Sequence, residues 1–268
     1  MDRVRRFREE HPLKRAAIGG QEWEYIAAGR GERALLLLPG ALAVADSTWL
    51  TLPHFEERFR VIAPTYAPVL TMAELADGIA GILDREGIQK AAVSGGSYGG
   101  LVAQVFVRRH PERTERLILS HTSLPDADRA RPMQWALRLL RWMPEGLIRS
   151  IFRKRLLGLL PRAPETAEFR AYTEEVTRRA TKREILALFW RGADFLVHYH
   201  LRPGDLAGWP GRVLLLMSDD DPVTPEPARK ALQALYPKAE VHVFSGSGHA
   251  TALLQPEKLY EVMDRFLE

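Results

Sequence analysis

The sequence contains no cysteine. Disulfide bonds, thiolate nucleophiles and cysteine-ligated zinc sites are therefore excluded. Long apolar runs are missing too, since none approaches the roughly 18 residues that a membrane-spanning helix needs. The N-terminus begins Met1-Asp2-Arg3 and is charged where a signal peptide carries its apolar core. We therefore predict a cytoplasmic chain with no stable membrane insertion.

Neither sign of charge is in large excess. The chain has 38 Lys and Arg against 34 Asp and Glu, a formal net charge of +4. The basic residues are spread along the sequence, and the densest short clusters are Arg3–Arg6 and Arg153–Arg155. A nucleic-acid-binding surface usually gathers such residues in one patch or stripe. We predict a solvated basic surface and no nucleic-acid partner; the composition makes no prediction of the oligomeric state.

Composition and residue pattern favour one globular α/β core. Hydrophobic residues make up 46% and charged residues 27% of the chain, which is ordinary for a globular protein. Short apolar runs alternate with helical patterns, as in a parallel sheet with helical crossovers. A capping box at Thr71–Glu74 opens one of these helices. The expected strands cover residues 34–38, 60–63, 90–94, 117–120, 213–217 and 241–244.

This alternation stops between Leu124 and Gly211. There, helical patterns follow one another without a strand, and one of them starts at a second capping box, Thr181–Glu184. Ligands of open α/β sheets bind at the carboxyl ends of the strands. We predict a mostly parallel central sheet flanked by helices, with an inserted all-helical cap over that edge. The core takes residues 1–123 and 212–268, and the cap takes residues 124–211.

Residues 95–99 read Gly-Gly-Ser-Tyr-Gly and match the pattern G-x-S-x-G. They directly follow an expected strand and precede a helical pattern. A strand, a sharp turn and a helix in this order are typical of a nucleophile elbow, which holds the serine hydroxyl above the sheet. A phosphate-binding glycine turn is the alternative, but neither G-x-G-x-x-G nor G-K-[ST] occurs. We predict Ser97 as the nucleophile.

A serine hydroxyl needs a base to remove its proton, and that base needs an acceptor to orient it. Of the eight histidines, His249 is the best placed, in a small-residue turn after the last expected strand. Asp221 follows the preceding strand, and the chain order Ser, Asp, His occurs in known triads. Asp219, Asp220 and Asp126 remain alternatives for the acid. We predict His249 as the general base and Asp221 as the residue that orients it.

The oxygen of a tetrahedral intermediate needs hydrogen-bond donors that are already in place. The backbone N–H groups of Tyr98, next to the nucleophile, and of Ala41, after the strand at 34–38, are candidates for this oxyanion hole. A plain turn is the alternative at Ala41. We expect Leu42, Trp142 and Phe189 to line the substrate pocket. No pattern predicts a cofactor or a metal.

On these motifs, the sequence resembles the α/β-hydrolase superfamily from about Glu22 to Phe266. One departure is Pro39-Gly40, where many members carry His-Gly, which leaves the second oxyanion donor open. Within the superfamily the sequence is most similar to maspardin-like members, which are regarded as adaptors with a degraded triad. Here the triad positions are all filled, which implies a working enzyme. This similarity involves Phe7-Arg8, Pro12-Leu13-Lys14, Leu35–Pro39, Arg60–Ala63, Leu101–Gln104 and Trp142-Met143-Pro144.

We therefore expect a serine hydrolase that cleaves a small or medium apolar carboxylic ester through an acyl-enzyme on Ser97. The same machinery can cleave thioesters, amides, peptides and carbon–carbon bonds, so these substrates remain alternatives. A noncatalytic maspardin-like binding protein is a further one. Dehalogenases and epoxide hydrolases of this fold are excluded, because they need a carboxylate at the position of Ser97.

Overall fold

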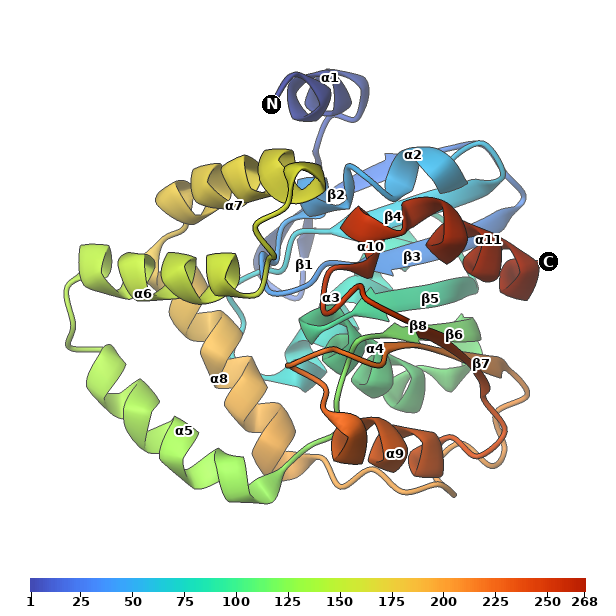
Figure 1. Ribbon diagram of the computed structural model, residues 1–268. Helices are drawn as coiled ribbons and strands as arrows, with labels where there is room; N and C mark the ends of the chain where they lie inside the picture. The colour runs from blue at the N-terminus through green and yellow to red at the C-terminus, as the bar shows by residue number, and fades with distance from the viewer.

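An eight-stranded sheet forms the centre of the computed structural model, which describes residues 1–268 apart from the side chains of residues 127–132 and 134. The strand order is β1-β2-β4-β3-β5-β6-β7-β8 (Figure 1). β1, β2 and β4 pair antiparallel, and the pairings from β4 to β8 are parallel. This sheet confirms the predicted fold class. The strands are β1 (Lys14–Ile18), β2 (Gln21–Ala28), β3 (Arg33–Leu38), β4 (Phe59–Pro64), β5 (Ala91–Gly96), β6 (Thr114–Ser120), β7 (Arg212–Ser218) and β8 (Glu240–Phe244).

Helices bury both faces of the sheet, and β3 explains how. Successive side chains of a strand point to opposite faces, so an unbroken leucine run serves two apolar layers. Leu36 and Leu38 pack in one layer, and Leu35 and Leu37 pack in the other. The first layer includes α3 (Met72–Arg85), α4 (Tyr98–Arg109) and α9 (Glu226–Leu235). The second includes α1 (Asp2–Glu10), α2 (Leu52–Phe55) and α11 (Pro256–Leu267).

Both predicted capping boxes are present at helix starts. The hydroxyl of Thr71 accepts a hydrogen bond from the N–H of Glu74, and Thr181 does the same with Glu184. In each case the glutamate carboxylate accepts from the N–H of the threonine in return. These contacts satisfy N–H groups that the first helical turn leaves without partners, which is why a four-residue pattern predicted where α3 and α8 begin.

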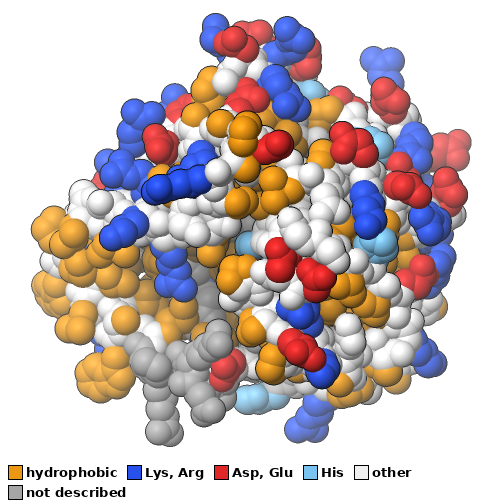
Figure 2. Space-filling view, viewed as in Figure 1, with side chains coloured by type: hydrophobic (Ala, Val, Ile, Leu, Met, Phe, Trp, Pro, Cys, Tyr) orange, Lys and Arg blue, Asp and Glu red, His pale blue; other side chains and the backbone are white. Residues whose placement is uncertain are grey.

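Four α-helices follow one another between β6 and β7, on the left in Figure 1. They are α5 (Ala127–Leu140), α6 (Glu145–Gly158), α7 (Ala167–Arg179) and α8 (Lys182–His198), and we call them the α5–α8 segment. Phe152 of α6 packs against Leu188 of α8. The buried guanidinium of Arg191 donates hydrogen bonds to Tyr98 Oη and to the carbonyl of Ala67, which ties the segment to the core. Figure 2 shows apolar side chains gathered over this side of the molecule.

The sequence analysis did not predict α1 or its contacts. Val4 and Phe7 of this helix are buried. The Arg8 guanidinium donates one hydrogen bond to Asp46, at 2.7 Å, and another to Glu175 of α7, at 2.8 Å. The remaining short elements are η1 (Ala45–Thr48), η2 (Pro111–Arg113), η3 (Pro164–Thr166) and α10 (Thr251–Leu254).

Candidate active site

Ser97 occupies a sharp turn between the end of β5 and the start of α4. Its φ is 53° and its ψ is −119°, a backbone conformation that non-glycine residues rarely adopt and that costs about 1–3 kcal/mol. The adjoining glycines make the turn sterically possible. A Cβ on Gly95 would lie 2.2 Å from the carbonyl oxygen of Gly99, and a Cβ on Gly99 would lie 2.3 Å from that of Leu38. The strained turn is therefore built around the serine hydroxyl.

His249 and Asp221 reach this hydroxyl from the loops after β8 and β7. The Ser97 Oγ–His249 Nε2 distance is 2.9 Å, and the His249 Nδ1–Asp221 Oδ2 distance is 2.8 Å. The exposed fractions of the His249 and Asp221 side chains are 9% and 0%. With Nδ1–H donating to the carboxylate, Nε2 is free to accept the serine proton. This is the geometry that a general base needs.

Asp221 is held as a carboxylate by its neighbours. Its Oδ2 accepts a second hydrogen bond from Thr224 Oγ1 at 2.7 Å, and its Oδ1 accepts one from the N–H of Val223 at 2.8 Å. Burial alone would raise the pKa of Asp221. The hydrogen bonds from His249, Thr224 and Val223, with the charge of His249, outweigh burial and hold this pKa well below its usual value. The residue that orients His249 therefore stays negatively charged.

The neighbouring aspartates accept hydrogen bonds from the loop after β8 instead. Asp219 accepts a hydrogen bond from Ser245 Oγ at 2.7 Å, on the exposed surface. Asp220 accepts one from the N–H of Gly248 at 2.9 Å, which holds the turn before His249. His249 Nδ1 thus makes its hydrogen bond to Asp221 rather than to Asp219, Asp220 or Asp126.

The two candidate oxyanion donors lie on either side of Ser97. Tyr98 is the first residue of α4, so its N–H is among those that a helix leaves without an internal acceptor. Ala41 follows β3 and lines the same cavities as Ser97. The Tyr66 hydroxyl donates to the carbonyl of Pro39 at 2.8 Å and holds this loop. The arrangement suits an oxyanion hole formed by Tyr98 and Ala41.

A second chain of hydrogen bonds runs beside these residues, and the sequence analysis missed most of it. The hydrogen-bond distances along it are 2.6 Å for Asp220–Ser218, 3.1 Å for Ser218–Ser247, 2.7 Å for Ser247–Thr251, 2.8 Å for Thr251–His121 and 2.8 Å for His121–Ser120. His121 directly follows β6, and this position at the carboxyl edge of the sheet is the one local sign that it could line the site. The members are Asp220, Ser218, Ser247, Thr251, His121 and Ser120.

The carboxylate at one end sets the direction of this chain. A carboxylate only accepts, so Ser218 donates to Asp220 and each later hydroxyl donates to the one before it. His121 Nε2–H then donates to Thr251, and the bare Nδ1 accepts from the hydroxyl of Ser120. Burial, together with the charge of His249, lowers the pKa of His121 to about 4. His121 is therefore a neutral neighbour of His249, whose ring centroid is 5.9 Å away.

The proposed proton transfer predicts the pH dependence of activity. Turnover that needs a neutral imidazole as proton acceptor should fall as the pH is lowered from about 8 to about 5, the range in which an imidazole ordinarily gains a proton. His121 stays neutral over this range, so a His121→Gln variant should lose activity over the same pH interval. The measurement is kcat/KM against pH, with circular dichroism at each pH to confirm folding. A flat profile down to pH 5 in the folded protein would exclude a histidine base.

Two cavities of about 260 Å³ each meet at Ser97. Ala41, His121, Leu156 and Leu159 line both of them. The first, the Phe169 cavity, is also lined by Leu42, Leu50, Ser120, Leu160, Phe169 and Thr173. The second, the Phe189 cavity, is also lined by Leu101, Met133, Phe152, Leu188, Phe189 and Leu196.

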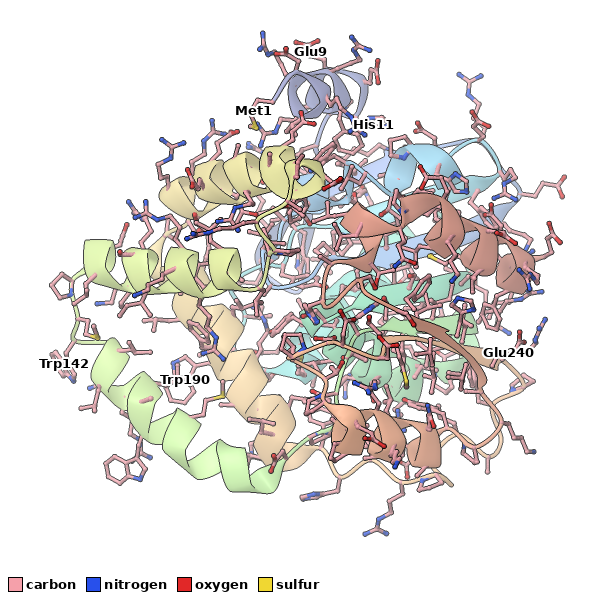
Figure 3. All side chains as sticks on the ribbon, in the orientation of Figure 1. Met1, Glu9, His11, Trp142, Trp190 and Glu240 are labelled. Atoms are coloured by element: carbon pink, nitrogen blue, oxygen red, sulfur yellow. The ribbon has the colours of Figure 1, made fainter. Side chains whose placement is uncertain are left out.

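Leu42 and Phe189 thus lie in a cavity that touches Ser97, whereas Trp142 does not. The Trp142 side chain is 76% exposed and points away from the sheet in the turn between α5 and α6 (Figure 3). The expectation that Trp142 lines the pocket is therefore corrected. Helical periodicity showed that the segment has apolar faces, but it did not show which of them turns toward the sheet.

Among the residues that the structure describes, no group of three or more histidine, aspartate or glutamate side chains could hold a metal ion. In the same part of the chain, no helix has the length and apolar character to cross a bilayer. The polar groups around Ser97 include the imidazole of His249, the carboxylate of Asp221 and backbone N–H groups, and this set suits proton transfer and anion stabilisation.

Comparison with known proteins places this geometry in a family. A 2-hydroxymuconate semialdehyde hydrolase of Pseudomonas putida is 28% identical over 196 residues, which are 70% of this chain and 66%, just under two thirds, of that protein. The putative carbamate hydrolase RutD of Caulobacter vibrioides is 24% identical, over 96% of this chain and 94% of its own. A thermophilic esterase of Thermogutta terrifontis superposes with a TM-score of 0.77 at 22% identity, over 95% of this chain and 97% of its own.

The model of the alpha/beta hydrolase family matches residues 35–262, a range that contains most of β3, the Ser97 turn and the loops that carry Asp221 and His249. The match therefore extends over most of the sheet and over every residue of the site. This chain belongs to the alpha/beta hydrolase family.

Proposed function

We propose that this hydrolase cleaves small or medium apolar carboxylic esters through an acyl-enzyme on Ser97. The observation that carries the proposal is the continuous hydrogen-bonded series Ser97–His249–Asp221 at the point where two apolar cavities meet. One cavity can hold the acyl group and the other the alcohol, with the ester carbonyl next to Ser97.

The reaction then runs in two halves. Ser97 Oγ attacks the carbonyl carbon while its proton moves to His249 Nε2, and the N–H groups of Tyr98 and Ala41 stabilise the oxyanion. Collapse breaks the ester C–O bond, and His249 returns the proton to the departing alcohol. A water molecule next gives a proton to His249 and attacks the carbonyl carbon of the acyl-enzyme. The tetrahedral intermediate then collapses, its bond to Ser97 Oγ breaks, and His249 returns the proton to Ser97 Oγ. Asp221 stabilises the imidazolium in both halves.

The lining of the cavities supports an apolar substrate. Side chains of α6 and α8, among them Phe152, Leu156 and Phe189, face the space beside Ser97. We propose that the α5–α8 segment acts as a cap that measures the substrate. Arg155 also lines the Phe189 cavity, and its side chain is exposed. Its positive charge suits a polar group at the end of the substrate that contacts solvent.

Ester length tests this role of the cavity. Each methylene buried in an apolar pocket contributes about 0.8 kcal/mol, or roughly fourfold in kcat/KM, until the pocket is full. Along a p-nitrophenyl ester series from acetate to palmitate, kcat/KM should climb and then fall sharply. Phe189→Ala should move the optimum to longer chains because it enlarges the cavity.

Trp142→Ala is the matched control, because this side chain lies outside both cavities. It should leave the length profile unchanged. A profile that is flat, or that Phe189→Ala does not shift, would contradict a role of the Phe189 cavity in holding the acyl group.

Carbon–carbon bond hydrolysis is the second candidate function. The relative named 2-hydroxymuconate semialdehyde hydrolase favours it. The two functions separate in a direct assay of purified protein with 2-hydroxymuconate semialdehyde and with p-nitrophenyl esters. We expect a higher kcat/KM on the esters, and the opposite result would replace the ester proposal with the carbon–carbon one.

A further inference from the structure

The outer face of α5 and α6 exposes an unusual amount of apolar surface. Trp135, Leu139 and Trp142 repeat at helical spacing and are 65%, 69% and 76% exposed. Leu147 and Ile151 continue the surface on α6 and are 48% and 46% exposed. Among the described residues, the three side chains on α5 and its end are the most exposed large hydrophobic ones. Figure 2 shows apolar side chains gathered on this side, and in Figure 3 Trp142 projects into solvent. We call these five residues the outer apolar face.

The stretch of sequence that carries this face is rich in basic residues. Residues 127–158 contain eight Lys and Arg but two Asp and Glu, whereas the other 236 residues contain 30 basic and 32 acidic ones. The positive net charge of the chain therefore comes from α5 and α6, and the basic residues are less evenly spread than the sequence analysis supposed. The guanidinium of Arg138 lies 5.2 Å from the ring of Trp135, and that of Arg141 lies 4.8 Å from the ring of Trp142.

Large exposed apolar patches usually mark an interaction site, and this charge selects the kind of partner. A symmetric dimer would place the same patch on both sides of its interface, so two basic surfaces would meet with few acids between them. A nucleic acid would neutralise the arginines but would leave Leu139, Leu147 and Ile151 without a function. An anionic lipid surface suits both the apolar and the basic side chains. Tryptophans and aliphatic side chains enter the headgroup region, and arginines contact the phosphates.

We propose that the outer apolar face docks this protein reversibly on anionic lipid surfaces. Docking is peripheral, and it requires no membrane-spanning helix. The helix that carries Leu147 and Ile151 on this face also carries Phe152 and Leu156 on the face that lines the Ser97 cavities. Docking therefore brings α6, which lines these cavities, to the lipid surface, where apolar molecules collect.

Vesicle co-sedimentation tests the proposal. The full chain should pellet with vesicles of equal parts phosphatidylcholine and phosphatidylglycerol, and binding should weaken with added salt because the ion pairs are screened. Binding to phosphatidylcholine alone should be far weaker. Arg138→Gln with Arg141→Gln should weaken binding to the anionic vesicles by about 30-fold. Leu139→Ser with Trp142→Ser should weaken it by more than about tenfold.

Val243→Ser is the matched control, because Val243 is 46% exposed on the edge strand β8 and lies outside the outer apolar face. It should bind vesicles like the unmodified protein. Ser97→Ala should also bind normally, so the result does not depend on the proposed hydrolytic function. Thermal melting of each variant checks that the fold is intact.

Three outcomes would overturn the proposal. The first is absence of binding to the anionic vesicles, or equal binding to both kinds of vesicle. The second is a dimer in light scattering that Leu139→Ser with Trp142→Ser dissociates, which would assign the face to a second copy of the chain. The third is salt-sensitive binding of duplex DNA that is lost in the arginine variant and that competes with the vesicles.

Discussion

Replacing Ser97 with alanine should abolish ester turnover, with a loss of about 10⁶-fold in kcat. Without the hydroxyl of Ser97 the turn carries no nucleophile, and His249 has no serine proton to accept. The same variant should also lose covalent labelling by a fluorophosphonate, because the probe reacts with an activated serine. Mass spectrometry of the labelled unmodified protein should place the adduct on Ser97.

Ser120→Ala is the matched control for this experiment. Ser120 lines the Phe169 cavity and also donates a hydrogen bond to a histidine, His121, but that histidine is buried and neutral and belongs to a separate hydrogen-bonded chain that ends at Ser120. The Ser120 variant should still be labelled. Intact turnover by Ser97→Ala, or an adduct on Ser120, would overturn the assignment. An unmodified protein that neither turns over esters nor accepts the probe would support a noncatalytic binding protein.

Asp221→Asn should lower kcat by about 10⁴-fold. An amide at this position can donate to His249 Nδ1, which stabilises the tautomer with a proton on Nε2 and prevents it from accepting the proton of Ser97. The Asp221→Asn substitution should also lower the free energy of unfolding. Because its pKa is depressed on folding, the Asp221 carboxylate stabilises the fold above its unfolded-state pKa of about 4, and this contribution fades as the pH falls below that value.

Asp219→Asn separates loss of catalysis from a general effect on the loop. Asp219 lies two residues away on the same turn, and its side chain accepts from the exposed Ser245. This variant should keep nearly full activity, and Asp126→Asn should do the same. Steady-state kinetics and thermal melting on all three variants provide the comparison. If Asp126→Asn were the damaging change and Asp221→Asn mild, the acid would have to be reassigned to the loop after β6.

The features that could be predicted from the residues were those with short-range causes. The two capping boxes depend on groups three residues apart, so they predicted the starts of α3 and α8. The short apolar runs predicted the strands from β3 to β7 because parallel strands inside a sheet are buried on both faces. The strained turn at Ser97 needs glycine at two nearby positions, and that requirement is visible in five consecutive letters.

Contacts between distant segments decided the rest. Asp219, Asp220 and Asp221 are equivalent as letters, and it was the placement of the loop after β8 that brought His249 to Asp221. The chain from Asp220 to Ser120 joins three separate loops, so no local pattern signalled it.

Trp142 and Phe189 show the same limit in the α5–α8 segment. Both lie in helical patterns with apolar residues at the same spacing, because periodicity reports that a face exists and not what it packs against. Packing of α6 and α8 against the loop after β3 and against Tyr98 turned Phe189 toward Ser97, while Trp142 was left in solvent. Local chemistry was thus enough for the strands from β3 to β7 and for the turn at Ser97. The antiparallel strands β1 and β2, the contact between His249 and Asp221 and the shape of the cavities came from long-range packing, which no short stretch of sequence encodes.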